Sequence, residues 1–185
     1  MLRRYPLIPR VWLMSDERLG DGHTRDGLLT AVARLPRGAG VVFRHYSLTE
    51  KDREALFARV QGLARGRGLH LVLAGSPGMA RRWRAAGSHG RAGKRRPEMA
   101  RSLSVHSFRE LAGAKRMGAH IIFISPVFPT RSHIGAASLG GIRFALLAHH
   151  ARHLGLIPIA LGGMTARRAR ALPHAYGWAG IDAFR

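Results

Sequence analysis

Short apolar runs alternate with amphipathic helical patterns along the whole chain. The apolar runs are nearly continuous, which is typical of parallel strands covered on both faces. They predict strands at residues 11–15, 40–44, 69–74, 102–105, 120–125, 157–161 and 178–181. The patterns between them predict helices at residues 26–35, 51–65, 77–86, 107–117, 140–154 and 165–172. This alternation indicates an α/β protein with a parallel sheet.

Two architectures fit this alternation, a closed (β/α)8 barrel and an open sheet, and the barrel requires eight strands. A short strand at Ser88–His89, in an otherwise degenerate fourth-strand region, would complete a set of eight. Eight β/α units would make the chain a (β/α)8 TIM barrel. At 185 residues this barrel would be compact, because such barrels usually have about 200 residues or more. A doubly wound open sheet fits the same alternation, although no GxGxxG spacing follows the first strand to indicate a dinucleotide site.

Few residues follow the last predicted strand, because the chain stops four residues after the run WAGI (178–181). No clear eighth outer helix is predicted, so the N-terminal arm or a partner subunit would have to cover that flank. A homo-oligomer is therefore one possibility. No linker divides the chain, and we expect residues 1–185 to form a single domain.

Composition narrows the class of protein. The absence of cysteine excludes disulfides, zinc–thiolate sites and cysteine nucleophiles. No run of about 18 apolar residues predicts a transmembrane helix. We interpret the basic N-terminal stretch as leading into a first strand, not as a signal peptide, and expect a cytoplasmic protein.

The charge is strongly basic, with 31 Lys+Arg against 10 Asp+Glu and a net charge of +21. Such an excess is a footprint of nucleic-acid binding. However, aromatic residues make up only 7% of the chain, which leaves few rings for stacking on bases. Nucleic acid is therefore not the expected main partner, and a basic nucleic-acid-associated protein is kept as an alternative.

The loops that follow the strands carry the candidate chemistry, because working residues of parallel α/β proteins lie at the carboxyl ends of strands. After the seventh predicted strand comes GGMT (162–165), followed by a helix. Two glycines allow backbone N–H groups to approach an anion, and a helix N-terminus favours negative charge. Gly162 and Gly163 thus predict a phosphate site, facing the polar loop after the sixth strand.

Several segments resemble the thiamine phosphate synthase family and its relatives, the thiazole tautomerase-like proteins. WLMSDERL resembles the family's opening L-Y-L-V-T-D strand, and VVFRHY lies where the family has a Q-L-R-x-K strand end. LSVHSFRELAGAKRMGAHIIFISPVFPTRS resembles G-V-S-x-H-S, a helix, and a strand that runs into G-P-V-F-x-T-x-T-K. IPIALGGMT resembles I-P-V-V-A-I-G-G-I. The resemblance implies a (β/α)8 barrel of thiamine biosynthesis.

The resemblance also implies a reaction, in which a pyrimidine pyrophosphate is joined to a thiazole phosphate with magnesium and pyrophosphate is released. It assigns catalytic positions to Arg44, Ser104 and His133. The phosphate-binding positions that it implies are Thr130, Ser132, Gly162, Gly163, Ile181 and Asp182. The expected partner is accordingly a phosphorylated small molecule: thiazole phosphate, thiamine phosphate or pyrophosphate.

Five departures from the family pattern bear on activity. Tyr46 replaces a lysine, Val42 replaces a pyrimidine-binding glutamine, and His133 replaces the lysine of T-x-T-K, where an imidazolium would supply the charge. Asp182 brings negative charge to a phosphate site. The family's magnesium-binding Asn-Asp and Asp correspond here to GSPG (75–78) and RAGKRRP (91–97), which contain no carboxylate. No metal site is therefore predicted, and activity is expected to be altered or lost.

Two further functions stay open. The tautomerase branch uses a histidine at the end of strand 6, where this chain has Pro126. Four other histidines are candidates for an acid or base: His45, His89, His106 and His133. A non-catalytic protein that binds thiazole phosphate or thiamine phosphate is the other alternative.

Overall fold

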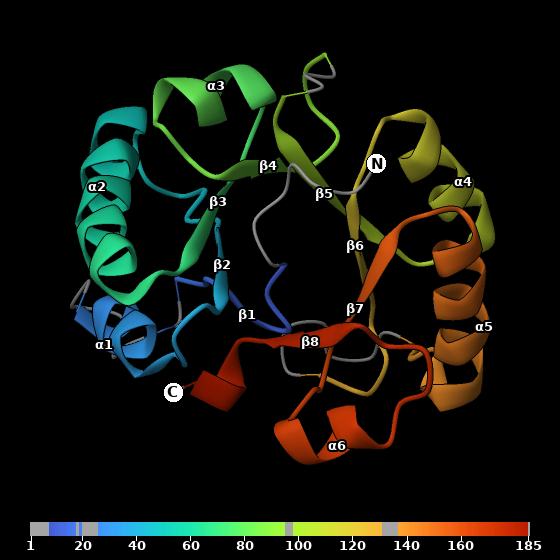
Figure 1. Cartoon of the computed structure of the whole chain (residues 1–185). Helices are drawn as coiled ribbons and strands as arrows, with labels where there is room; N and C mark the ends of the chain where they lie inside the picture. The colour runs from blue at the N-terminus through green and yellow to red at the C-terminus, as the bar shows by residue number, and fades with distance from the viewer. Residues whose placement is uncertain (1–7, 18, 20–25, 95–97, 131–136, 185) are drawn as a thin grey trace.

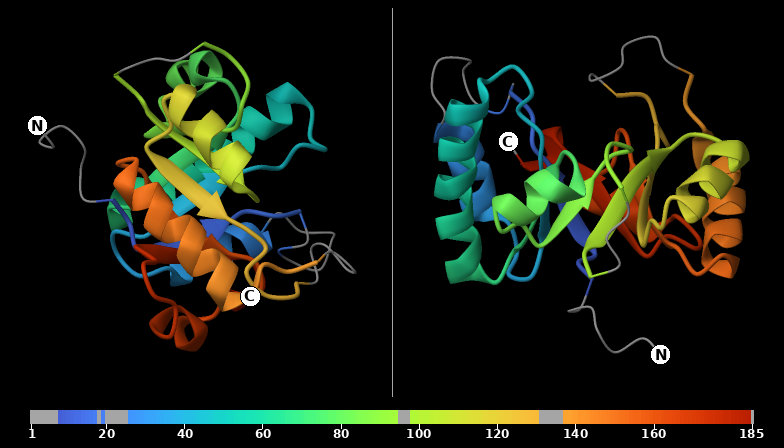
Figure 2. Two further views of the ribbon diagram at one scale, coloured as in Figure 1. Left: turned by 90° about the vertical axis from the view of Figure 1, so that its right-hand side faces the viewer. Right: turned by 90° about the horizontal axis from the view of Figure 1, so that it is seen from above.

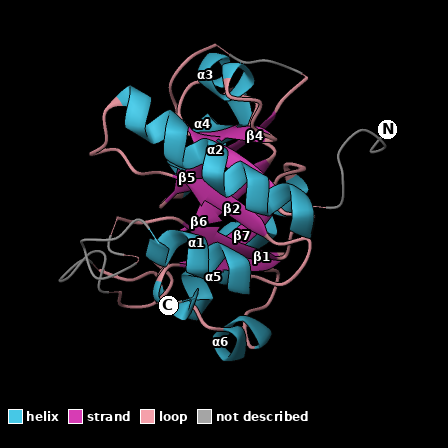
Figure 3. Ribbon diagram, turned by 90° about the vertical axis from the view of Figure 1, so that its left-hand side faces the viewer, coloured by secondary structure: helices cyan, strands magenta, loops and turns pink. Residues whose placement is uncertain are grey.

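A computed structural model describes residues 8–17, 19, 26–94, 98–130 and 137–184. In this part of the chain, eight parallel strands close into a barrel in the order β1 to β8, with helices on the outside (Figures 1 and 3). The strands are β1 (Val11–Met14), β2 (Gly40–Phe43), β3 (His70–Ala74), β4 (Gly87–His89), β5 (Ala100–Val105), β6 (Ile121–Ile124), β7 (Ile157–Leu161) and β8 (Gly177–Gly180). The closed ring confirms the predicted barrel and excludes the open sheet.

The helices are α1 (Asp26–Arg34), α2 (Glu50–Arg67), α3 (Pro77–Arg82), α4 (Phe108–Arg116), α5 (Gly140–His153) and α6 (Ala166–Arg170). Side-chain caps begin α2, α3, α4 and α6: Thr49, Ser76, Ser107 and Thr165 each accept a hydrogen bond from a backbone N–H in the first turn. Five helices are shorter than predicted, and the difference exceeds two residues in α3 and α6. α3 ends at Arg82 because Arg84 adopts a positive φ of 56°, and α6 ends shortly before Pro173, whose ring disfavours helix at the preceding residue.

Aromatic rings fill the barrel. Trp12 on β1 and Phe123 on β6 meet edge to face, with ring centroids 5.6 Å apart. Because β1 and β6 are not neighbouring strands, this contact crosses the interior. His89 on β4 also meets Phe123, at 5.4 Å. The side views in Figure 2 show the helices around this packed centre.

The described residues that follow β8, on the flank for which no clear eighth outer helix is predicted, pack back onto that strand. After β8, the described chain continues as a short 3-10 turn, η2 (Asp182–Phe184). The Phe184 ring stacks on Trp178 of β8 at 5.3 Å. The preceding segment is fixed to the N-terminal arm, since the Tyr176 hydroxyl donates to the Ile8 carbonyl at 2.9 Å. Among the described helices, none has the length and apolar character that a membrane crossing requires.

Candidate functional site

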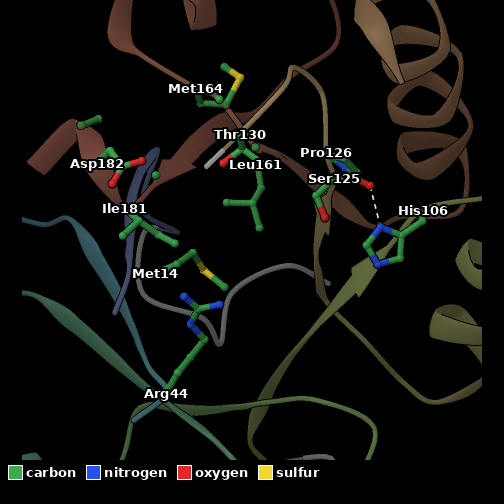
Figure 4. A pocket seen from close by; sticks show the side chains of 14 residues that line it. Met14, Arg44, His106, Ser125, Pro126, Thr130, Leu161, Met164, Ile181 and Asp182 are labelled. Atoms are coloured by element: carbon green, nitrogen blue, oxygen red, sulfur yellow. Dashed lines mark hydrogen bonds between the residues drawn. The ribbon is translucent and has the colours of Figure 1, made fainter. Parts of the chain in front are cut away.

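A pocket of about 440 Å³ opens at the carboxyl ends of the strands. Its wall is formed by the end of β1 and by the ends of β2, β5, β6, β7 and β8 with the loops that follow them (Figure 4). The lining residues are Met14, Arg44, His106, Ser125, Pro126, Thr130, Leu161, Gly162, Gly163, Met164, Gly180, Ile181, Asp182 and Ala183. We call this cavity the main pocket. It brings together most of the positions that the sequence predicts for phosphate binding.

The Gly162–Gly163 turn forms one side of the main pocket. Both residues have positive φ angles, 94° and 60°, and both lie against the loop after β6. A Cβ atom at Gly162 would lie 2.7 Å from Pro126 Cα, and one at Gly163 would lie 2.5 Å from the Pro129 carbonyl oxygen. Only glycine satisfies both the backbone conformation and the space.

Hydrogen bonds hold this turn in place. The Phe128 N–H donates to the Gly162 carbonyl at 3.1 Å. Arg168 of α6 donates to the Gly163 carbonyl and lies over the Phe128 ring, 4.8 Å from its centroid. The loops after β6 and β7 are thereby joined into one rigid wall of the pocket.

The opposite side of the main pocket comes from the end of the chain. Ile181 and Asp182 follow β8 and line the cavity together with Thr130 and the apolar side chains of Met14, Leu161 and Met164 (Figure 4). Such a pocket has an apolar body and a polar rim. This arrangement suits a small ring that carries a charged group. Two predicted residues of the site, Ser132 and His133, lie outside the described residues.

Arg44 reaches the main pocket from the end of β2. Its Nε donates to the Ser15 carbonyl at 2.6 Å, and its Nη2 lies 3.0 Å from Asp16 Oδ2. Its own backbone N–H donates to Ser15 Oγ at 2.8 Å. The guanidinium is therefore held by the loop after β1, and part of its charge is balanced by Asp16.

Sequence reasoning missed the residue that supports this loop, Arg53 of α2. The Arg53 side chain is buried, and its Nε and Nη2 donate to the Arg44 and Ala74 carbonyls at 2.8 and 2.6 Å. Its guanidinium also lies within 6 Å of the rings of Phe43, Tyr46 and Trp83. Burial lowers the pKa of Arg53. An arginine on the buried face of the predicted helix KDREALFARV was the available signal.

A second, smaller pocket of about 310 Å³ lies beside the main pocket. It is lined by Tyr46, His89, Gly90, Arg91, Leu103, Ser104, His106 and Glu110. The structure thus places Ser104 here, on β5, and not in the main pocket with Arg44. His106 lines both pockets and so stands at their boundary.

The four candidate histidines differ in their surroundings. His45 is buried, accepts or donates a hydrogen bond at 3.0 Å to Ser15 Oγ, and lies outside the lining of both pockets. His89 is bonded through Nδ1 to Ser102 Oγ at 3.0 Å. His106 Nδ1 lies 2.6 Å from the Ser125 carbonyl oxygen. His133 lies outside the described residues.

Burial makes His89 a neutral imidazole. Desolvation, aided by the positive charge of Arg44, lowers the pKa of His89 from its ordinary 6.5 to about 4. Between these values the unfolded chain binds a proton at this residue and the folded chain does not. Stability is therefore full above pH 6.5 and falls as the pH drops toward 4, by about 1.4 kcal/mol per pH unit.

We predict that His89→Gln, which keeps a polar partner for Ser102, removes much of this acid sensitivity. Wild type should lose about 3 kcal/mol more than the variant between pH 6.5 and pH 4. Urea denaturation across this range measures the difference, with His150→Gln on the exposed face of α5 as the control. Equal losses in wild type and His89→Gln would contradict the assignment of a neutral, buried His89.

The described residues do not form a binding site for the magnesium ion that the resemblance implies. No group of three or more histidine or carboxylate side chains converges on one point among the residues with described positions. Of the two carboxylates after β1, Asp16 pairs with Arg44, and Glu17 accepts from the Ser47 N–H at 2.8 Å. At the carboxyl ends of β3 and β4, the described loop residues include Ser76, Arg91 and Lys94, and the one described carboxylate of the two loops, Glu98, is exposed and lies just before β5. Because divalent cations need oxygen ligands, we derive no step through magnesium.

The fold and the site define a class: a (β/α)8 barrel with a glycine-rich turn and polar loops around a pocket at the carboxyl ends of its strands. The comparison with family models then assigns the family. The model described as thiamine monophosphate synthase matches residues 15–184. The chain belongs to this family, which confirms the resemblance found in its motifs.

Solved structures support the fold. Thiamine phosphate pyrophosphorylase from Pyrococcus furiosus is similar with a TM-score of 0.72 and 17% identity, over 94% of this chain and 86% of that one. An HpcH/HpaI aldolase from Desulfitobacterium hafniense is similar with a TM-score of 0.57 and 11% identity, over 94% and 86% of the two chains. At these identities the likeness shows the fold alone. No curated protein matches the chain.

Proposed function

We propose that this protein binds a thiazole phosphate in the main pocket, as a single-domain member of its family acting in thiamine biosynthesis. The observation that carries the proposal is the convergence of the Gly162–Gly163 turn, Thr130 and residues 181–183 on one pocket with apolar walls. The phosphate would lie in the crevice between Gly162–Met164 and residues 181–183. The thiazole ring would lie against Met14, Leu161 and Met164.

The chemistry of the rim supports an anion at this place. Glycine backbone N–H groups can come close to phosphate oxygens, and hydroxyl groups such as that of Thr130 add donors. Arg44 brings a cation to the same pocket and would face the ring or a second charged group of the ligand. The apolar walls would exclude water from the ring and fix its orientation.

The family supplies two reactions for such a complex. In the joining reaction, Arg44 and Ser104 would meet a pyrimidine pyrophosphate, and Ser104 lines the adjoining second pocket. In the tautomerisation, a residue of the site would act as acid and base toward the thiazole compound. His106 lines the main pocket, where a histidine can act as an acid or a base. This placement supports the tautomerisation as an alternative to the joining reaction.

Calorimetric titration with thiazole phosphate tests the binding proposal. Wild type should bind the phosphate ester and should bind the dephosphorylated alcohol at least tenfold more weakly, because the rim recognises the charge. Equal affinities for the ester and the alcohol would contradict the proposed phosphate crevice. Product analysis with a pyrimidine pyrophosphate present, with and without magnesium, then tests the joining reaction separately.

Asp182 leads to a further prediction. Its carboxylate lines the proposed phosphate crevice, and like charges at short range repel each other. We expect Asp182→Asn to raise the affinity for thiazole phosphate roughly fivefold at low salt, with a smaller gain at high salt. Glu54→Gln, which makes the same charge change on the exposed side of α2, should leave affinity unchanged. Weaker binding by Asp182→Asn would show that the carboxylate assists the ligand.

A further inference from the structure

Three histidines lie close together on the outside of the barrel. His149 and His153 belong to the last two turns of α5, and His174 lies in the connection between α6 and β8, which passes beside α5 (Figure 1). All three side chains are exposed. Because each outer helix returns the chain to the amino ends of the strands, the last turns of α5 lie toward the opposite end of the barrel from the main pocket.

The rings of His149 and His153 are directed at each other. Residues four apart on a helix are neighbours on one face, and the Nε2 atoms of this pair are 3.0 Å apart. In a hydrogen bond between them, one Nε2 carries the proton and the other supplies its electron pair, so at least one imidazole is neutral. When the shared proton is lost or moves to Nδ1, both Nε2 atoms present electron pairs to the same place.

The neighbouring groups favour the neutral form of this pair. The His174 ring contacts the His149 ring, with centroids 5.0 Å apart. Desolvation and the positive charge of His153, His174 and His150 lower the pKa of His149. His150 itself is directed toward α4, where its ring meets the Phe108 ring at 5.7 Å. The neutral imidazole is the form that binds metal ions.

The distance between the two Nε2 atoms matches two adjacent ligand positions of a metal ion. Imidazole nitrogens bind such ions at about 2.0–2.1 Å, so two of them lie about 2.9 Å apart at a right angle and about 3.3 Å apart at the tetrahedral angle. The observed 3.0 Å is closer to the right angle. Right angles are typical of the square-planar or tetragonal coordination of Cu²⁺ and Ni²⁺, for which imidazole is a suitable ligand.

We propose that His149 and His153 form a surface binding site for a tetragonal divalent cation, Cu²⁺ or, more weakly, Ni²⁺. Each residue supplies its Nε2, and the ion replaces the proton that the two rings share. Water completes the coordination, because no group of three or more histidine or carboxylate side chains could hold an ion among the residues with described positions. The C-terminal turn of α5 favours a cation, which offsets part of the repulsion from the net charge of +21. This site is independent of the function proposed above.

Calorimetric titration of the full chain with Cu²⁺ and Ni²⁺, in a buffer that does not chelate metals, tests the site. Wild type should bind Cu²⁺ more tightly than Ni²⁺. His149→Gln and His153→Gln each remove one ligand and should weaken Cu²⁺ binding at least about tenfold, because changes next to a ligand already cost about 10- to 100-fold. His150→Gln is the matched control, since its ring is directed toward α4, and it should bind as wild type does.

Electron paramagnetic resonance of the Cu²⁺-loaded chain provides a second measurement that does not depend on affinity. Wild type and His150→Gln should show a tetragonal spectrum with couplings to two imidazole nitrogens, and both ligand variants should lose it. Circular dichroism should be unchanged in all variants, because the substituted side chains are exposed. The site is overturned if wild type does not bind Cu²⁺, or if either ligand variant binds it with the wild-type affinity and spectrum.

Discussion

Replacing Gly163 with alanine is expected to weaken thiazole phosphate binding strongly and to destabilise the fold. The added Cβ would lie 2.5 Å from the Pro129 carbonyl oxygen and 2.9 Å from Phe128 Cβ, at a residue with φ of 60°. Left-handed backbone strain and overpacking each cost about 1–3 kcal/mol, so the free energy of unfolding should fall by about 3 kcal/mol. The loops after β6 and β7 would separate, and the loss of a hydrogen bond to the phosphate, worth about 1.5–3 kcal/mol, should lower the affinity roughly 10- to 100-fold.

The control for this substitution is Gly62→Ala in α2. No heavy atom lies within 4 Å of a Cβ at Gly62, and alanine is the better helix former. This variant should bind ligand as wild type does and gain roughly 0.5–1 kcal/mol in stability. Urea denaturation and calorimetric titration measure both quantities. Wild-type affinity in Gly163→Ala would show that the turn does not contact the ligand.

The second large effect is expected for Arg53→Leu. This change leaves the carbonyls of Arg44 and Ala74 without their donor and removes a cation from three aromatic rings. Arg53 is only 8% exposed, so water cannot easily replace these bonds. Leaving a buried carbonyl without its donor costs about 1–3 kcal/mol, so the free energy of unfolding should fall by about 2–5 kcal/mol for the two carbonyls together. Because Arg44 is anchored to Arg53 through its carbonyl, ligand affinity should also fall.

Two further variants test whether the guanidinium of Arg53 causes this loss of stability. Arg53→Lys retains the charge but not the forked guanidinium, so it should recover only part of the stability. Arg65→Leu, on the exposed side of the same helix, should change stability by less than about 0.5 kcal/mol. If Arg53→Leu unfolds at the same urea concentration as wild type, the three rings pack equally well without the cation, and the account of this support is wrong.

The order of elements was readable from the sequence because apolar runs and capping residues act locally. Even the three-residue strand β4 (Gly87–His89) lies where the run Ser88–His89 predicted one. The limits of α3 and α6 were less accurate, since one depends on the positive φ of Arg84 and the other on the few residues before Pro173. Closure of the barrel came from the family resemblance, because the alternation alone fits an open sheet equally well.

The site was predictable only in part. Motif positions indicated that Gly162, Gly163 and Ile181 lie at strand ends, and strand ends meet at one face of a barrel. The structure adds contacts between loops, which depend on backbone conformation that no local pattern specifies. The bond between His106 and Ser125, and the separation of Ser104 from Arg44 into two pockets, are of this kind. The roles of these residues stay predictions.

A crystal structure of the complex with thiazole phosphate tests the central claim most directly. We predict that the phosphorus atom lies in the crevice between Gly162–Met164 and residues 181–183, with the ring against Met14, Leu161 and Met164. A phosphate bound elsewhere on the strongly basic surface, with the main pocket empty or closed by side chains, would contradict the account.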